Sequence, residues 1–286
     1  MTNRLKSMDR SGSEGGWHSP YYAYRLILLV YVITIYTILY TPLVMIAVLS
    51  FNTSEITGFP IKGFSLIWYK AVVSDPALLA SFINSLGVAT LAATISTTLA
   101  LLLCLGFRHS FRGKEAVFNL ILVPIIIPGI IGGIALLIFF GYLGIRSSLY
   151  TTVLAAHVNW ALPFAFLTLY PRLHGFDKTL EEAAMDLGAS SWQIFSRIVL
   201  PIVRPGIIAT FLFSFTLSFD EFIRTIFLTG FDRTVPIQLW GMIVDEISPE
   251  LPAMAVIIIL VSAASALVGF AFSARATRRA GQGAPE

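Results

Sequence analysis

The chain has 286 residues, of which 56% are hydrophobic and only 12% are charged, and its mean hydropathy is +0.81. Soluble domains carry about 25% charged residues, so half that fraction cannot cover the surface of a water-soluble protein of this length. The composition excludes a soluble enzyme, a disordered regulator and a disulfide-stapled secreted module, and it indicates a polytopic membrane protein. The formal net charge of +3 matters less than where the charges lie, and nucleic acid is not an expected partner.

Six apolar stretches each supply the roughly 20 residues that a helix needs to cross the hydrocarbon core of a bilayer. In chain order they cover about Leu26–Phe51, Leu78–Phe107, Val117–Phe140, Leu149–Leu169, Gly206–Gly230 and Pro252–Phe272. The sequence therefore predicts an all-α membrane protein with six transmembrane helices within residues 26–275. Residues 1–25 and 276–286 are expected to form cytoplasmic tails.

The basic residues orient these spans in the lipid bilayer. Fourteen of the 19 Lys and Arg residues fall in the two tails and in the second and fourth connections, whereas four fall in the connections on the other side. Because connections on the cytoplasmic side carry the excess of Lys and Arg, both termini are expected to be cytoplasmic. An even number of spans gives the same topology.

The third span contains two prolines, Pro124 and Pro128, and the glycines Gly129 and Gly133 follow them. A proline removes a helix hydrogen bond, and within lipid only neighbouring protein groups can replace it. Two glycines four residues apart allow close packing of helices. Two interpretations stay open: a kinked helix with ordinary packing, or a broken helix that lines a path.

The fourth connection, residues 172–205, is unusually long. Thr179 and Glu182 have the spacing of a capping box and Gly188 has the position of a C-terminal stop, so a short helix is expected between them. A second short helix is expected after it, ending at Pro201 before the fifth span. Because the cytoplasmic lipid surface is itself negative, an acidic amphipathic helix on this side is typical of a docking element for a cytosolic protein.

The same connection carries a spaced motif. It reads Glu182-Ala183-Ala184, then Gly188 after three residues, then Ile198-x-Leu200-Pro201 after nine more. This pattern resembles the EAA loop of the permease subunits of ABC importers. Over residues 26–275 the chain is similar to the spermidine/putrescine branch of that family, and the segments that carry this similarity are Gly63–Tyr69, Phe111–Lys114, Ser214–Glu221 and Ser248–Glu250.

The resemblance implies the type I ABC importer permease fold in a bacterial inner membrane. It also implies three kinds of partner: two ATPase subunits, a second homologous permease subunit and a periplasmic substrate-binding protein. The ATPase would bind ATP and magnesium, so this chain is expected to need no cofactor and not to be an enzyme; its sequence contains no Gly-x4-Gly-Lys-Ser/Thr phosphate loop. The residues implied to couple the chain to the ATPase are Glu181, Glu182, Ala183, Ala184, Asp186, Gly188, Leu200 and Pro201.

Three charged residues, Asp220, Glu221 and Arg224, fall within the predicted fifth span. Charges at this depth are costly and commonly functional. On one helix both carboxylates would reach the guanidinium, because they precede it by four and three residues. Two interpretations stay open: a polar pathway for an amine or a cation, or a locally paired trio that packs against the partner subunit.

The fourth span adds His157, Asn159 and Trp160 as candidate pathway residues. An indole ring binds alkylammonium groups through a cation–π contact, but Trp160 alternatively only packs, and His157 alternatively bridges helices by hydrogen bonds. The resemblance implies import of a polyamine-like amine from periplasm to cytoplasm. Because Arg224 leaves its trio with a net charge of −1, a monocationic, zwitterionic or guanidino substrate is the alternative. An ion-coupled secondary transporter is less favoured, since it would not need the projecting loop.

Overall fold

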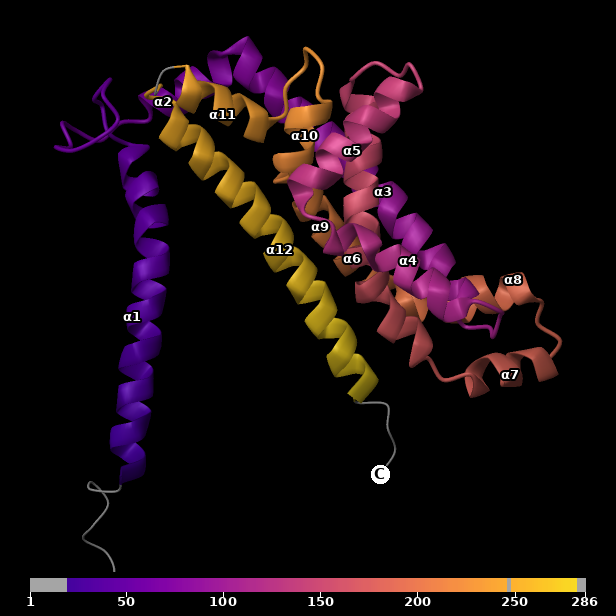
Figure 1. Cartoon of the computed structure of the whole chain (residues 1–286). Helices are drawn as coiled ribbons and strands as arrows, with labels where there is room; N and C mark the ends of the chain where they lie inside the picture. Colours follow the sequence, from indigo (N-terminus) through magenta and orange to yellow (C-terminus); the bar gives the residue numbers. More distant parts are fainter. Residues whose placement is uncertain (1–19, 246–247, 282–286) are drawn as a thin grey trace, which may run out of the picture.

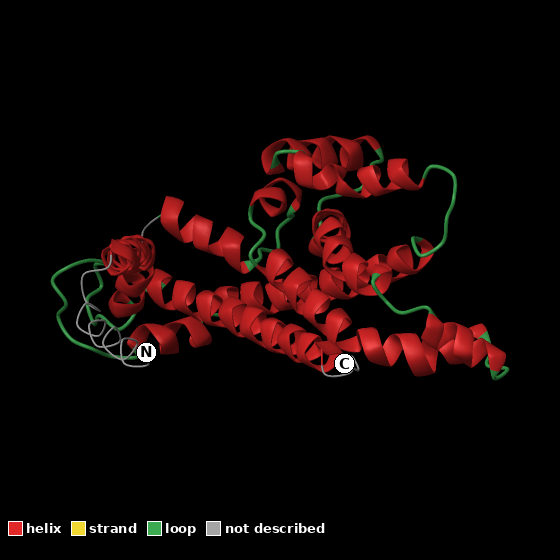
Figure 2. Cartoon of the chain, turned by 90° about the horizontal axis from the view of Figure 1, so that it is seen from below, coloured by secondary structure: helices red, strands yellow, loops and turns green. Residues whose placement is uncertain are grey.

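The computed structural model describes residues 20–245 and 248–281, and the regular elements within these residues are helices (Figure 2). The α-helices are α1 (Pro20–Leu49), α2 (Ile67–Ser74), α3 (Pro76–Gly106), α4 (Lys114–Ile126), α5 (Gly129–Tyr142), α6 (Leu154–His174), α7 (Thr179–Asp186), α8 (Ser191–Ile194), α9 (Leu200–Phe219), α10 (Ile223–Leu228), α11 (Val235–Val244) and α12 (Leu251–Gly281). Two π-helical turns, η1 (Leu149–Val153) and η2 (Phe195–Val199), precede α6 and α9.

Within the described residues, five helical runs are long and apolar enough to cross a membrane, and the bent pair α4–α5 makes a sixth crossing when it is counted as one span. The prediction of an all-α membrane protein with six spans is therefore confirmed. The predicted tails lie largely outside the described residues. Where they are described, the terminal helices extend into them, since α1 begins at Pro20 and α12 ends at Gly281.

The centre of the bundle consists of α3, α6 and α9, which pack against one another. Their contact surfaces are rich in alanine, whose small side chain lets helix backbones approach closely. The fully buried alanines of α3 and α6 are Ala89, Ala92, Ala93, Ala100, Ala156, Ala161 and Ala165. By contrast, α1 stands apart from this centre and meets α12 (Figure 1), and its residues 24–45 are all exposed within this chain.

The third span is a broken helix, because α4 and α5 meet at an angle of 105°. Ile127 adopts an extended conformation before Pro128, as the steric demand of a following proline ring favours, and α5 starts directly after that proline. Close packing is present as well: a Cβ atom on Gly133 would lie 2.7 Å from the ring of Phe227 in α10. The proline pattern thus marked the break, and the glycine pattern marked a packing surface.

The fifth span differs from its predicted range, Gly206–Gly230. One helical run covers Ser191–Phe219 by joining α8, η2 and α9, so the predicted helix end at Pro201 is wrong. In the π-helical turn the Leu200 N–H bonds to the Phe195 carbonyl, and the helix continues past Pro201 directly after this wider turn.

The fifth span also ends earlier than predicted. The helix breaks after Phe219, and α10 begins at Ile223. The Glu221 carboxylate accepts the backbone N–H of Arg224 at 2.9 Å, which provides a partner for one of the unpaired donors at the start of α10. The charged residues therefore lie at a break between two helices rather than along one helix.

Candidate functional site

A buried polar cluster joins α6 to the break between α9 and α10. The His157 side chain is 1% exposed, and its Nδ1 and Nε2 atoms lie 2.7 Å from Ser218 Oγ and 2.8 Å from Thr225 Oγ1. The Thr225 hydroxyl donates its proton to the Glu221 carbonyl at 2.7 Å, so His157 Nε2–H must donate to Thr225 and Nδ1 must accept from Ser218. The geometry therefore matches the interpretation of His157 as a bridge between helices.

The same cluster contains a buried ion pair between Glu221 and Arg224. Their side-chain atoms Oε2 and Nη1 are 3.1 Å apart, and the two side chains are only 8% and 6% exposed. The guanidinium carbon of Arg224 also lies 3.9 Å from the centre of the Trp160 ring. The indole face of Trp160 is thus occupied by an arginine of the same chain, whose charge is balanced by Glu221.

Asp220 does not join this pair, which corrects the expectation that both carboxylates reach Arg224. The helix break directs its side chain toward α12, where both carboxylate oxygens accept from Ser262 Oγ, at 2.8 and 3.1 Å. Asp220 is exposed, and it forms no ion pair with any residue that the structure describes. It is therefore the carboxylate of the trio whose charge the chain leaves uncompensated.

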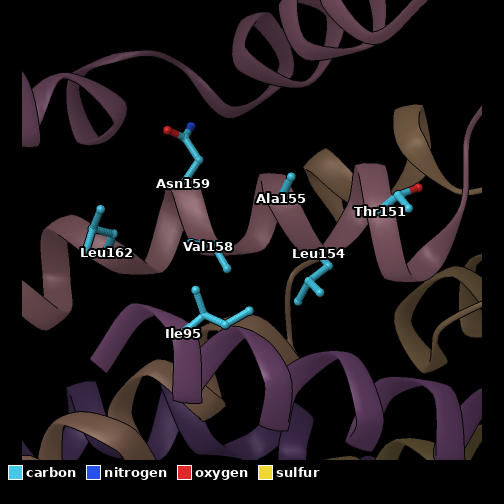
Figure 3. Close-up of a pocket in the computed structure, with 7 residues that line it drawn as sticks. All are labelled: Ile95, Thr151, Leu154, Ala155, Val158, Asn159 and Leu162. Atoms are coloured by element: carbon cyan, nitrogen blue, oxygen red, sulfur yellow. The ribbon is translucent and has the colours of Figure 1, made fainter. Parts of the chain in front are cut away.

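Asn159 is also separate from the cluster. It is exposed on α6 and lines an open hollow of about 490 Å³ that runs along η1 and α6 and includes Ile95 of α3. Figure 3 shows Leu154 and Val158 of α6 directed toward Ile95 of α3, with Asn159 on the other side of the helix. The hollow is mainly apolar, so it lacks the charges that would bind a cation.

The long connection forms the predicted helix α7, but not with the predicted cap. The N-terminal residue Thr179 makes no capping hydrogen bond; instead the Asp177 carboxylate accepts the Thr179 N–H at 2.9 Å. This hydrogen bond holds the pKa of Asp177 below its usual value. The capping box of this connection is formed by Ser190 and Gln193 at the start of α8.

Gly188 makes the turn between α7 and α8. Its φ is +84°, a left-handed conformation that glycine adopts without the strain a Cβ atom would cause. The turn carries α7 away from the bundle, on the side of the molecule that bears the basic connections (Figure 1). Because α7 ends at Asp186, just before this turn, the helix stop predicted at Gly188 agrees with the structure.

The outer surface of α7 and α8 is both apolar and acidic. Leu180, Leu187 and Trp192 are 47%, 90% and 71% exposed, and Glu182 and Asp186 of the same segment are also exposed. Three large apolar side chains exposed within 13 residues favour an interaction surface over a solvated helix.

The remaining predicted coupling residues differ in their surroundings. Ala183 is exposed, whereas Ala184 packs against the hydrophobic core beneath α7. Glu181 is partly buried in an ion pair with Arg108. Leu200 and Pro201 lie at the start of α9, inside the long helical run and not at the end of a separate helix. Sequence reasoning missed Arg108, for which no signal existed in the spacing of the motif.

Comparisons with known proteins agree with this architecture. Residues 94–281 match the family described as binding-protein-dependent transport system inner membrane component. The chain is 36% identical over 230 residues to the spermidine/putrescine transport system permease protein PotC of Escherichia coli K12, covering 80% of this chain and 86% of that protein. It is 32% identical over 246 residues to the putrescine transport system permease protein PotI of the same organism, covering 82% and 85%.

Two solved structures share the fold. A chain of a bacterial alginate ABC transporter, in complex with an alginate-bound periplasmic protein, superposes with a TM-score of 0.68 at 16% identity, covering 89% of this chain and 94% of that one. A chain of the inward-facing MetNI methionine ABC transporter gives 0.55 at 16% identity, covering 71% and 95%. With its family match, its relatives and this type I permease fold, the chain belongs to the inner membrane components of binding-protein-dependent transport systems.

Proposed function

We propose that this chain is the permease subunit of an ATP-driven importer that moves a small polyamine-like amine from the periplasm to the cytoplasm across a bacterial inner membrane. The observation that carries the proposal is the identity of 36% over most of the chain to a spermidine/putrescine permease. The partners would be two ATPase subunits, a second homologous permease subunit and a periplasmic binding protein. ATP and magnesium would bind to the ATPase, and this chain would be a non-catalytic subunit.

The proposed contact with the ATPase is the exposed surface of α7 and α8. Leu187 and Trp192 would supply apolar area, and Glu182 would supply a charge-assisted hydrogen bond. Ala183 has no long side chain to hold the partner away. Gly188 sets the angle between the two helices, so a displacement of α7 by the partner would reach α9 through a short, defined connection.

The proposed cation-binding group of the substrate pathway is Asp220. It lies at a helix break within the bundle, its carboxylate is exposed, and its described partner is a neutral hydroxyl, Ser262. Glu221, by contrast, already neutralises Arg224. The trio of one subunit would therefore offer one uncompensated carboxylate, and a substrate with two or more ammonium groups would need a further carboxylate, which the second permease subunit would supply.

The same charge count supports the alternative substrate class. A monocationic, zwitterionic or guanidino compound would be matched by Asp220 alone, without a carboxylate from the second subunit. Its transport would then be independent of acidic residues in the partner permease, whereas transport of spermidine would depend on them.

The test is uptake of labelled putrescine and spermidine in cells that express the neighbouring subunits with and without this chain. Uptake should require the chain, and Glu182→Lys should abolish it while leaving the protein in the membrane. The same charge reversal at Glu115, an exposed acidic residue at the start of α4, is the matched control and should retain uptake. Uptake of neither amine, with an intact complex, would remove the polyamine assignment.

A further inference from the structure

An ion pair on the basic side of the molecule connects two segments that are far apart in the sequence. Arg108, just after the end of α3, pairs with Glu181 in the first turn of α7. The two side chains are 12% and 19% exposed, so the pair is largely shielded from water. The Arg108 guanidinium also lies over the ring of Phe176, 5.3 Å from its centre.

This pair is a large part of what holds α7 to the rest of the chain. None of the residues of α7 is fully buried, and its inward contact with the hydrophobic core is made through Ala184. A helix of only eight residues is marginal by itself and depends on its tertiary contacts, of which the ion pair is one. The ion pair between Glu181 and Arg108 therefore contributes to the position of α7 relative to α3.

On the other side of the ion pair, Arg108 is anchored firmly. The preceding residue, Phe107, is 2% exposed, and its ring packs edge-on against Phe166 of α6. The helix that it terminates, α3, has 31 residues and is therefore about 46 Å long. A displacement of Arg108 would thus act on the central helix of the bundle.

The half of α3 opposite Arg108 is tied to the segment that leads into α11, through residues that lie more than two turns inside the helix. Ser85 Oγ accepts the backbone N–H of Val235 at 2.8 Å, and Asn84 donates to the Arg233 carbonyl at 3.2 Å. One helix therefore connects α7, on the side of the basic connections, with a loop on the opposite side (Figure 1). The ion pair lies just after the C-terminal end of α3, and the hydrogen bonds lie in its N-terminal half.

We propose that Arg108 is a positioning residue that transmits the displacement of α7 to α3 through Glu181. The two acidic residues of the first turn then have different tasks: Glu182 faces the ATPase, whereas Glu181 acts within the subunit. This inference rests on the proposed function, because it assumes that an ATPase displaces α7.

The test uses the complete transporter in proteoliposomes and measures substrate moved per ATP hydrolysed. Arg108→Gln and Glu181→Gln should each lower this ratio about fivefold, the low end of typical coupling between sites, while the ATPase stays bound. The double variant should be no worse than either single variant, because both remove the same interaction. The charge swap, Arg108→Glu with Glu181→Arg, should recover the ratio to within about twofold. Arg112→Gln, a nearby exposed arginine, is the control and should leave the ratio unchanged.

Several results would overturn the inference. If the single variants keep the ratio of the parent protein, or if their losses multiply in the double variant, the ion pair does not carry coupling. A charge swap that binds the ATPase but is no better than the single variants has the same meaning. Failure of the proposed function is distinguishable, because the unchanged chain would then neither retain the ATPase nor transport.

Discussion

Glu221→Gln should destabilise the protein far more than Asp220→Asn, although the two carboxylates are neighbours in the sequence. Glutamine at 221 can still accept the Arg224 N–H, but it leaves the guanidinium uncompensated in a site that is 6% exposed. Removing one partner of a buried ion pair costs about 3–5 kcal/mol. Asparagine at 220 keeps an oxygen for the Ser262 hydroxyl, so its cost should not exceed about 1 kcal/mol.

The assay is the fraction of protein that stays monodisperse in detergent after heating, measured by size-exclusion chromatography. Glu221→Gln should lower the midpoint temperature by about 10 °C, and Asp220→Asn by no more than about 3 °C. Adding Arg224→Gln to Glu221→Gln should recover part of the loss, since no unpaired charge is then left buried. Transport by Asp220→Asn should nevertheless be strongly reduced. Equal midpoints for the two single variants would refute the distinction between a fixed pair and a free carboxylate.

Two further predictions concern the packing around this cluster. Gly133→Ala should lower the stability by about 1–3 kcal/mol, because its Cβ would lie 2.7 Å from the Phe227 ring. Gly132→Ala, whose Cβ would lie 3.6 Å from its nearest neighbour, should be close to neutral, and the heating assay compares the two variants. Trp160→Ala should lower the midpoint temperature because it removes the ring over Arg224, and Trp160→Phe should keep most of the midpoint temperature of the parent protein. If Trp160→Ala instead leaves the stability unchanged and weakens binding of the amine, the ring lies in the pathway.

The membrane architecture could be predicted from the sequence because each span must satisfy its backbone within one segment of sufficient length. The break at Pro128 could be anticipated for a similar reason, since a proline limits both itself and the residue before it. The break after Phe219 could not. Neither proline nor glycine lies there, and the start of α10 is supported by the side chain of Glu221. The spacing of residues along a helix does not predict that this side chain accepts a backbone N–H at a helix start.

In the candidate site, the sequence predicted the contact between near neighbours but not the contacts between distant residues. The contact of Glu221 with Arg224 follows from a separation of three residues, which brings them together on any helical turn. The partner of Asp220 is Ser262, and that of Glu181 is Arg108, which lie 42 and 73 residues away in the sequence. Such pairings depend on how helices pack, and one sequence without its fold contains no local signal for them.

An arginine beside a pathway for amines would repel its substrate if its charge were free. In this chain the charge of Arg224 is matched by Glu221 and covered by the ring of Trp160, while His157 fixes the adjoining backbone through Ser218 and Thr225. The ion pair is therefore suited to hold the break between α9 and α10 in place. In the proposed importer, that rigid support would present Asp220, the uncompensated carboxylate of the trio, to a passing ammonium group, so the arginine would serve the selection of cations rather than oppose it.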